Sequence, residues 1–394
     1  MTSLGRTVTI SFWVAFALSH FYLGFRLYTW VLAPVCRFPL WILACLMLFL
    51  GGSFQVGHNA RKWPLWLRRF LIAVGGHWAG ALLPLLLGFV GLDVLRLLFL
   101  LGGLVFPPYL LFYASLAILA TVSLLLIWGT LCAVRPRVTR YTIPVHKKAG
   151  TLSSLRVALV SDVHLGVSID AKQLRAMCKA LQDLSPDLIL IAGDLLDSGL
   201  PGLHDADKIQ SVLSGLHAPH GVYVCLGNHD VRGGVTTEET IRFFQRCGLS
   251  VLHDSAVHIL GSYTLIGRAD YGFSKTAGAP RASVAELVLG ADPAQPVLLV
   301  DHQPNQLVQA ADAGVDVQFS GHTHRGQMFP ISLLTRRQFE TDFGLWKYGQ
   351  FTAVVSSGYG TWGPRLRLGS HSELVLATLV FDAYNHVFLR YSFQ

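Results

Sequence analysis

Five short motifs rich in Asp, Asn and His carry the residues that could do chemistry in this chain. In chain order they are Asp162-x-His164, Gly193-Asp194-x-x-Asp197, Gly227-Asn228-His229-Asp230, Asp301-His302 and Gly321-His322-Thr323-His324. They supply oxygen and imidazole-nitrogen ligands without thiolate, which suits divalent Mn, Fe, Co or Zn rather than Cu(I) or iron–sulfur clusters. They also suffice for two ions that share a carboxylate. Two ions about 3.5–4 Å apart can hold both the attacking and the leaving oxygen of a phosphoryl transfer.

Each motif follows an apolar run that predicts a strand. The runs are Arg156–Val160, Leu188–Ala192, Val222–Leu226, Val297–Val300 and Val317–Phe319. Polar residues that follow such strands lie at the carboxyl edge of a sheet, where α/β proteins usually bind ligands. Five such ends in one sheet would bring the motifs to one spot.

The five motifs, in this order, resemble those of the calcineurin-like metallophosphoesterase superfamily, whose pattern is D-x-H, G-D-x-x-D, G-N-H-D/E, H and G-H-x-H. The resemblance extends from Leu155 to the C-terminus. It implies that Asp162, His164, Asp194 and His324 hold one metal ion, and that Asp194, Asn228, His302 and His322 hold a second. Taken singly, such residues are usually turns, helix caps or solvated histidines. The ordered set predicts two divalent ions, manganese being favoured over iron and zinc.

His229 follows a predicted ligand and is the candidate for protonating or stabilising the leaving oxygen. Such a role is worth roughly 10²–10⁴-fold in rate. An imidazole in this role needs an acceptor for its second nitrogen. The family pattern favours Asp197 as that acceptor, and Asp230 is an alternative. A metal would supply the nucleophile, because it lowers the pKa of a bound water toward about 7.

Substrate contacts are predicted from two later segments. The last motif continues as Arg325-Gly326-Gln327, and Gly358-Tyr359-Gly360-Thr361-Trp362-Gly363-Pro364-Arg365 follows. These extensions resemble the membrane-associated, YkuE/YaeI-like bacterial branch of the superfamily, which includes hydrolases of UDP-2,3-diacylglucosamine. Arg325 and Arg365, with Arg367, could offer planar guanidinium groups to phosphate oxygens; a structural role is expected for at least one of them. The apolar residues 328–348 are either a lid on the bilayer that admits an acyl chain or a loop packed on the domain.

The first 134 residues are much more apolar than the rest. The whole chain is 52% hydrophobic and 14% charged, an average of a membrane-like part and an ordinary one. A membrane-crossing helix needs about 20 mostly apolar residues. The stretches 8–32, 38–56, 70–92 and 108–134 meet this requirement. We favour a retained anchor over a cleaved leader at the first stretch, because three more spans follow.

Basic residues predict the orientation in the membrane. His58–Arg69 and Arg135–Lys148 are rich in Lys and Arg, and such loops stay cytoplasmic. We therefore expect a cytoplasmic catalytic domain, anchored in a bacterial inner membrane. Leu95–Phe106 would reverse this orientation as an extra crossing, but a run of about a dozen residues is more often re-entrant or interfacial.

The remaining charged residues of this apolar part are expected to lie at its edges or in its loops. Arg26 is expected to snorkel to the headgroups, and Asp93 and Arg96 are expected to lie in a loop. The net charge of +8 is best explained by attraction to anionic lipid, so no nucleic-acid partner is expected.

The predicted domains are a transmembrane region at 1–134, a basic linker at 135–150 and a catalytic domain at 151–394. Helices are predicted at Asp170–Leu184, Asp205–Leu216, Thr236–Cys247 and Gln306–Ala313, and late strands at Phe351–Ser357, Leu374–Phe381 and Val387–Phe393. A four-layer α/β/β/α sandwich accommodates this order, and the resemblance implies the same fold.

The predicted function is hydrolysis of a phosphodiester or pyrophosphate bond in a lipid-linked substrate, such as UDP-2,3-diacylglucosamine or a phospholipid. One alternative is a broad phosphoesterase or nuclease that the anchor only localises. A nuclease predicts a basic stripe interleaved with aromatic residues, which the sequence does not show. Another is a transporter or sensor with a regulatory phosphoesterase-like domain. A regulatory domain of this kind would be expected to have lost a metal-binding residue, yet all five motifs are intact.

Overall fold

The computed structural model describes residues 3–272 and 280–382. Its contacts divide the chain into two units. The first unit comprises Met1–Leu131 together with Gly363–Leu366, and the second comprises Cys132–Trp362 together with Arg367–Gln394.

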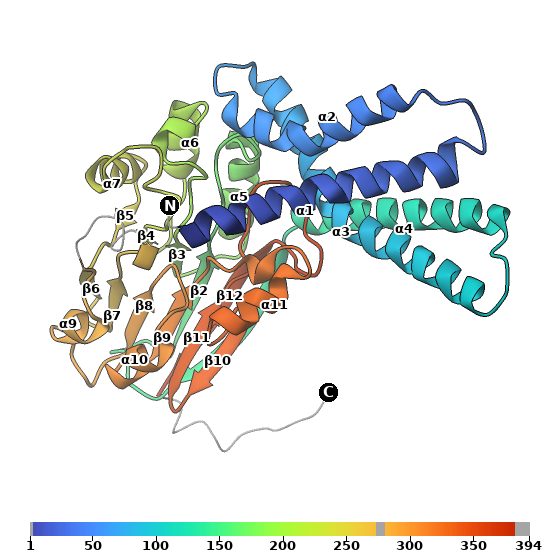
Figure 1. Ribbon diagram of the computed structural model, residues 1–394. Coiled ribbons are helices and arrows are strands. Elements are labelled where there is room, and N and C mark those ends of the chain that lie inside the picture. The colour runs from blue at the N-terminus through green and yellow to red at the C-terminus, as the bar shows by residue number, and fades with distance from the viewer. Residues whose placement is uncertain (1–2, 273–279, 383–394) are drawn as a thin grey trace. The chain divides into compact units, whose positions relative to one another are not determined.

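The helices of the apolar part are long (Figure 1). They are α1 (Ser3–Leu27), continued by a π-helical turn at Tyr28–Leu32, α2 (Leu40–Asn59), α3 (Leu65–Leu101) and α4 (Pro108–Val134). All four are long and apolar enough to cross a membrane. Within the described residues Leu95–Phe106 is no separate crossing, because its first seven residues continue α3 and the rest leads into α4.

The positions and partners of two charged residues in these helices differ from those predicted. Arg26 does not simply snorkel, because its guanidinium pairs with Asp93 through Nη2 and Nε, both at 2.8 Å. The Tyr22 hydroxyl donates to the same carboxylate at 2.5 Å. Asp93 lies inside α3, not in a loop. Charges within a membrane are costly unless paired, so this cluster ties α1 to α3.

Arg68 also departs from the predicted basic loop. It lies in the second turn of α3, is buried, and donates to the carbonyl oxygen of Gly57 at 3.1 Å. That carbonyl belongs to the last turn of α2, whose final oxygens lack partners within the helix. One of the predicted cytoplasmic charges therefore joins two helices.

The second unit is built on two sheets. The order of the first sheet is β1-β12-β2-β3-β4-β5, and that of the second is β10-β11-β9-β8-β7-β6. The first sheet contains β1 (Arg137–Val145), β2 (Ser154–Val160), β3 (Leu188–Ala192), β4 (Val222–Cys225), β5 (Ser250–Val251) and β12 (Glu373–Phe381). The second contains β6 (Ser255–Ile259), β7 (Tyr263–Gly267), β8 (Val297–Val300), β9 (Val317–Ser320), β10 (Gly344–Tyr348) and β11 (Phe351–Val355).

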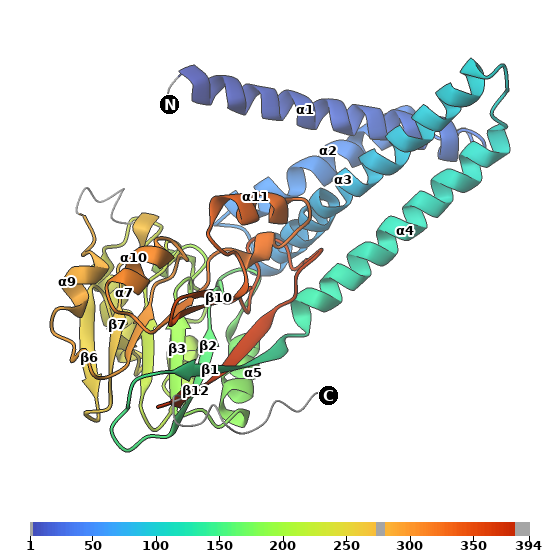
Figure 2. The same ribbon diagram turned by 90° about the horizontal axis from the view of Figure 1, so that it is seen from below.

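Helices cover the outer faces of both sheets (Figure 2). The first sheet packs on α5 (Ala171–Asp183), α6 (Ala206–Leu213) and α7 (Thr237–Arg246). The second packs on α9 (Val284–Val288) and α10 (Leu307–Asp312). A third core, with Leu159 and Leu190 from one sheet and Leu298 and Phe319 from the other, lies between them. The predicted four-layer α/β/β/α architecture is confirmed.

The alternating directions of side chains along the strands explain how one sheet contributes to two apolar cores. Along β2, Val157 and Leu159 face the second sheet, whereas Ala158 and Val160 face the helices. Successive side chains point to opposite faces of a strand, so a strand buried on both faces is apolar throughout. The five site strands are divided between two sheets, which corrects the expectation of one.

The predicted basic linker contains a strand. β1 pairs in parallel with β12 from Arg137↔Glu373 to Val145↔Phe381. Its exposed arginines are typical of an edge strand, because charged residues discourage pairing with other chains. They also made the segment resemble a linker. The predicted strand Val387–Phe393 lies outside the described residues.

Candidate metal centre

Seven side chains predicted as metal ligands follow the carboxyl ends of five strands. Asp162 and His164 follow β2, Asp194 follows β3, and Asn228 follows β4. His302 follows β8, and His322 and His324 follow β9. β2, β3 and β4 are parallel neighbours, as are β8 and β9. Parallel strands end at the same edge of a sheet, so each sheet delivers its motifs together.

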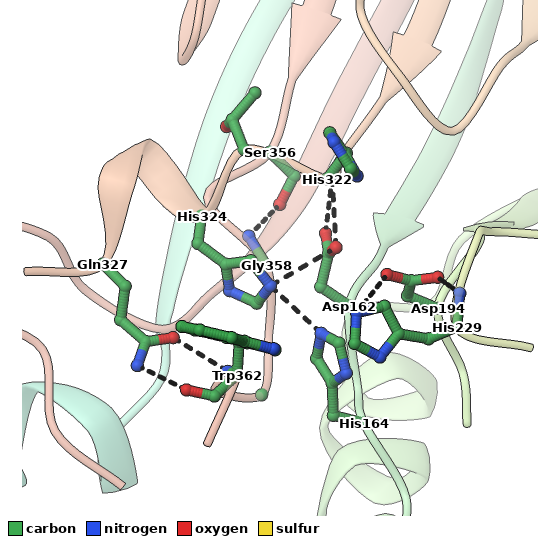
Figure 3. Close-up of polar contacts among 12 residues, drawn as sticks. Asp162, His164, Asp194, His229, His322, His324, Gln327, Ser356, Gly358 and Trp362 are labelled. Carbon is green, nitrogen blue, oxygen red and sulfur yellow. Dashed lines mark hydrogen bonds and ion pairs between the residues drawn. The ribbon is translucent and has the colours of Figure 1, made fainter. Parts of the chain in front are cut away.

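Candidate ligand atoms approach one another in three overlapping groups, of which two contain predicted ligands alone and the third joins His164 and Asp194 to His229. Figure 3 shows the side chains of Asp162, His164, His324 and His229 turned toward one another. In one group of predicted ligands, Nε2 of His324 lies 3.1 Å from Nε2 of His164 and 3.5 Å from Oδ1 of Asp162. In the other, Nε2 of His302 lies 3.2 Å from Nδ1 of His322 and 3.3 Å from Oδ2 of Asp194. Within each group, all three candidate ligand atoms lie within 4.8 Å of one another.

This arrangement fits bound cations. Asn228 Oδ1 is buried and has no hydrogen-bond partner among the described residues. A buried polar atom of this kind is costly unless something satisfies it. Asp162 and Asp194 are also buried, and imidazole nitrogens face them. Oxygen and nitrogen donors that converge without thiolate suit two hard or borderline divalent ions.

The backbone of the site is unusual. Five of the candidate ligands have a positive φ: 53° at Asp162, 54° at His164, 52° at Asp194, 71° at His322 and 48° at His324. Few residues other than glycine adopt this left-handed region, and such residues cluster at functional sites. Each turns the chain sharply after a strand. The surrounding packing therefore has to hold five of the seven candidate ligands in a conformation that they would not favour alone.

Two motif glycines leave room for ligands from other motifs. A Cβ on Gly227 would collide with the carboxylate of Asp194, and one on Gly321 would collide with that of Asp162. Both collisions involve side chains that are already buried. The glycines are therefore required by close approach.

Sequence comparisons agree with this geometry. The calcineurin-like phosphoesterase family matches residues 155–326. An uncharacterized metallophosphoesterase of Aquifex aeolicus is 30% identical over 247 residues, which cover 62% of this chain and 91% of that protein. The chain belongs to the calcineurin-like phosphoesterases.

Two other relatives of this calcineurin-like phosphoesterase have more specific names. A Danio rerio transmembrane protein with a metallophosphoesterase domain is 29% identical, over 66% of this chain and 61% of that protein. The UDP-2,3-diacylglucosamine pyrophosphatase LpxG of Chlamydia trachomatis is 23% identical, over 62% of this chain and 90% of that protein. The chain spans about three fifths of the length of the Danio rerio relative and of two from Helicobacter pylori. With its four apolar helices, this phosphoesterase is a membrane protein.

In the site of this calcineurin-like phosphoesterase, burial and neighbouring charges shift the pKa values of the candidate ligands in opposite directions. Burial alone would raise the pKa of Asp194, but neighbouring His302 holds it well below its usual range. Burial likewise opposes protonation of His302, yet Asp194 raises the pKa of that imidazole well above its usual value. Burial and the charge of His302 lower the pKa of His322 to about 4. His322 is therefore kept neutral, so its ring nitrogens are available as ligands.

His229, predicted to act on the leaving oxygen, also forms a group of candidate ligand atoms with His164 and Asp194, and its Nε2 lies 4.0 Å from Asp194 Oδ2. Its Nδ1 donates to the main-chain carbonyl of Asp197 at 2.6 Å. The carboxylate of Asp197 is nearer to His164, at 3.4 Å, than to His229, at 4.0 Å. Asp197 thus orients His229, but through its backbone oxygen instead of the predicted carboxylate.

Asp230, the alternative acceptor, has another role. Its carboxylate accepts from the backbone N–H groups of Asp194, Leu196 and Gly227, at 2.8–2.9 Å. It therefore joins two of the metal motifs and stays buried. It does not orient His229.

The three arginines considered for phosphate binding are placed differently. Arg367 is fully buried and donates to the carbonyl oxygens of Ser357, Gly358 and Gly360, at 2.6–3.0 Å. It is thus structural and not a phosphate ligand. Arg325 stacks on Phe343, 4.6 Å from the ring centre, and lines a neighbouring cavity with Arg336. Arg365 belongs to the first unit, not to the unit that holds the candidate ligands.

Sequence reasoning missed the function of the Gly358-Tyr359-Gly360 loop. The backbone N–H groups of Tyr359 and Gly360 donate to the carbonyls of Ser161 and Asp162, at 2.9 and 2.8 Å. Arg367, which holds this loop, also contacts His324 Nδ1 at 3.3 Å. The loop and Arg367 therefore connect two candidate ligands of one metal. The two glycines of the loop were the available signal.

A cavity of about 340 Å³ opens over the candidate ligands. Its lining also includes Gln327, Met328, Ile331 and Trp362, which belong to the later segments named from the sequence, and Arg232, which was not predicted. Gln327 exchanges two hydrogen bonds with the backbone of Trp362, at 2.8 and 2.9 Å (Figure 3). The side chain of Trp362 is thereby held at the cavity while staying half-exposed.

Proposed function

We propose that this protein is a membrane-anchored phosphoesterase that hydrolyses a phosphodiester or pyrophosphate bond with the help of two divalent metal ions. The observation that supports the proposal is the meeting of six of the seven predicted ligands in groups of candidate metal-binding atoms, beside a cavity that Asn228, the seventh, also lines. Asp162, His164, Asp194 and His324 would hold one ion. Asp194, Asn228, His302 and His322 would hold the other.

Two bound ions, for which manganese is our first choice, would neutralise phosphoryl oxygens and provide a nucleophile from water at neutral pH. The protein itself has to orient the substrate and supply a proton to the leaving oxygen. His229 is our candidate for the second task, because its Nδ1 is fixed by Asp197 and its Nε2 faces the ligand groups. Arg232 also lines the cavity and approaches His229 Nδ1 at 3.1 Å.

We further propose a lipid-linked substrate, such as UDP-2,3-diacylglucosamine or a phospholipid. The name of the Chlamydia trachomatis relative supports this substrate class. So does the cavity, whose lining combines polar ligands with Met328, Ile331 and Trp362. We retain Arg325 and Arg365 as candidate phosphate contacts. We place the protein in a bacterial inner membrane with a cytoplasmic catalytic domain.

The test uses the full chain in detergent, loaded with Mn²⁺. We expect hydrolysis of bis-p-nitrophenyl phosphate and faster hydrolysis of UDP-2,3-diacylglucosamine, with a monoester as the comparison substrate. Chelation and Asp194→Asn should both abolish the activity. Asp183→Asn, which changes an exposed aspartate of α5 paired only with Lys179 among the described residues, is the matched control.

Three results would count against the proposal. Full activity in His322→Ala would contradict the metal assignment. Activity that survives removal of metal would contradict the chemistry. Equal rates with and without an acyl chain would contradict the lipid substrate alone.

A further inference from the structure

α11 (Ile331–Gln338) has one side at the cavity and another at the surface. Ile331 and Thr335 line the cavity, one helical turn apart, and Met328 precedes them. Phe329, Leu333 and Leu334 are 58%, 52% and 67% exposed. The helix therefore carries large apolar side chains outward, directly beside the opening of the site.

α11 exposes apolar side chains that a helix of a soluble domain would normally bury. On the side toward the protein, Thr335 donates to Asp342 at 2.7 Å and the backbone of Ser332 lies against Gly326. At 3.6 residues per turn, Leu333, Leu334 and Arg337 share the opposite side. Helices on soluble domains normally bury the apolar side and expose the polar one.

The exposed charges of α11 are positive. Arg336 and Arg337 form its last turn, and both are exposed. The nearby acidic side chains accept hydrogen bonds from the protein: Glu340 from the backbone N–H of Leu307 at 3.0 Å, and Asp342 from Thr335. Leucines beside exposed arginines are typical of helices that lie at a membrane surface with anionic lipids.

We propose that the apolar rim, defined as Phe329, Leu333, Leu334 and Trp362, inserts into the headgroup region of the bilayer, so that the cavity receives its substrate from the membrane plane. Phe329, Leu333 and Leu334 are exposed within six residues of chain, and exposed apolar patches usually mark a binding surface. We assign the bilayer as the partner of this surface, because the same chain carries four helices long and apolar enough to cross it. Delivery of the substrate rests on the proposed function, whereas insertion of the rim does not.

Insertion can be measured without catalysis. In the full chain reconstituted in nanodiscs that contain phosphatidylglycerol, the exposed Cys36 and Cys45 would be replaced by Ser. An environment-sensitive fluorophore would then be placed on Leu334→Cys. The matched control is Leu289→Cys, at a leucine that is 84% exposed elsewhere on the same unit. We expect lipids spin-labelled near the headgroup to quench the probe at 334 and aqueous iodide to quench only the probe at 289.

A probe at 334 that behaves like the probe at 289 would overturn the proposal. So would a probe at 334 that is shielded from iodide yet not quenched by lipid, because that result would indicate a protein partner on this surface.

The second arm tests delivery of the substrate. We expect the double variant Leu333→Asp, Leu334→Asp to lower kcat/KM for UDP-2,3-diacylglucosamine in nanodiscs by roughly tenfold, since it removes interfacial apolar area. Hydrolysis of soluble bis-p-nitrophenyl phosphate and all activity of Leu289→Asp should stay unchanged. Equal losses on both substrates would overturn the delivery role. If the unsubstituted chain hydrolyses nothing, the proposed function fails, while the quenching result still decides whether the rim inserts.

Discussion

His229 shows how its surroundings set the chemistry of one side chain. The short contact to the carbonyl of Asp197 requires a proton on Nδ1, because a carbonyl oxygen can only accept. In the neutral imidazole, Nε2 then has a lone pair toward the site. Burial, with further contributions from His164 and Arg232, lowers the pKa of His229 below its usual value. The doubly protonated form that can give up a proton is therefore lost as pH rises through a value below 6.5.

This predicts a pH dependence of kcat. If His229 protonates the leaving oxygen, kcat for bis-p-nitrophenyl phosphate should fall with rising pH on a limb below 6.5. His229→Ala should lower kcat by roughly 10²–10⁴-fold and remove that limb. The control is His217→Ala, which changes an exposed histidine hydrogen-bonded to Gln182. A limb that persists unchanged in His229→Ala would show that another group titrates.

Arg367 acts on the site through other residues. It is fully buried and holds the Gly358–Gly360 loop and His324 together. Its loss would leave several buried carbonyl oxygens without a donor. Lysine keeps the charge but cannot reproduce the planar set of donors.

We therefore expect Arg367→Ala to weaken Mn²⁺ binding by roughly 10–100-fold, as for other groups that support metal ligands. Titration calorimetry on the full chain would measure this affinity. Arg367→Lys should restore part of it, and Arg175→Ala, at an exposed arginine of α5, should have no effect. Unchanged affinity in Arg367→Ala would show that the loop holds the ligands without it.

At the scale of elements, α1 and α3 are joined by charges within the apolar part of the chain. Arg26 and Asp93 meet with two nitrogen–oxygen contacts of 2.8 Å. The guanidinium also lies 4.6 Å from the centre of the Trp30 ring. Water is scarce around such helices, so neither charge has an equally good alternative partner.

Asp93→Asn should therefore destabilise the helical unit by about 1.5–3 kcal/mol, the usual value of hydrogen bonds to charged groups. A lower midpoint of thermal unfolding in detergent would show it. Arg96→Gln changes a neighbouring exposed charge of α3 and is the control. Equal midpoints for both variants would mean that the Arg26–Asp93 pair contributes no net stability.

At the scale of the whole molecule, the number of membrane crossings decides where the second unit lies. If each of the four candidate spans crosses the membrane once, residues before α1 and after α4 lie on the same side. Basic residues of the Ala60–Pro64 connection and of Arg135–Lys148 favour the cytoplasm for that side. With five crossings the ends would be on opposite sides.

We expect green fluorescent protein fused after Gln394 to fluoresce in bacterial cells. Alkaline phosphatase fused at the same point should stay inactive, because it matures only outside the cytoplasm. The reverse fusion after Gly103, between α3 and α4, should give active alkaline phosphatase. An active fusion after Gln394 would reverse the orientation.

The family, the strands that precede the five motifs and the four-layer architecture could all be predicted from the amino-acid sequence. These features depend on short-range patterns: apolar runs that end at Asp, Asn or Gly, and helices with regular apolar spacing. Ala171–Asp183 and Thr237–Arg246 are examples, since both begin at a capping box readable from the sequence.

Contacts between side chains that are far apart in the sequence could not be predicted and are known from the folded structure. Arg26 pairs with a residue 67 positions away, and Arg367 reaches His324 over 43 positions. The basic segment that resembled a linker became β1 because β12, far along the chain, offered it an edge. A sequence specifies the hydrogen-bonding capacity of each side chain, but the partner is chosen by packing, which brings distant groups together and excludes water from between them.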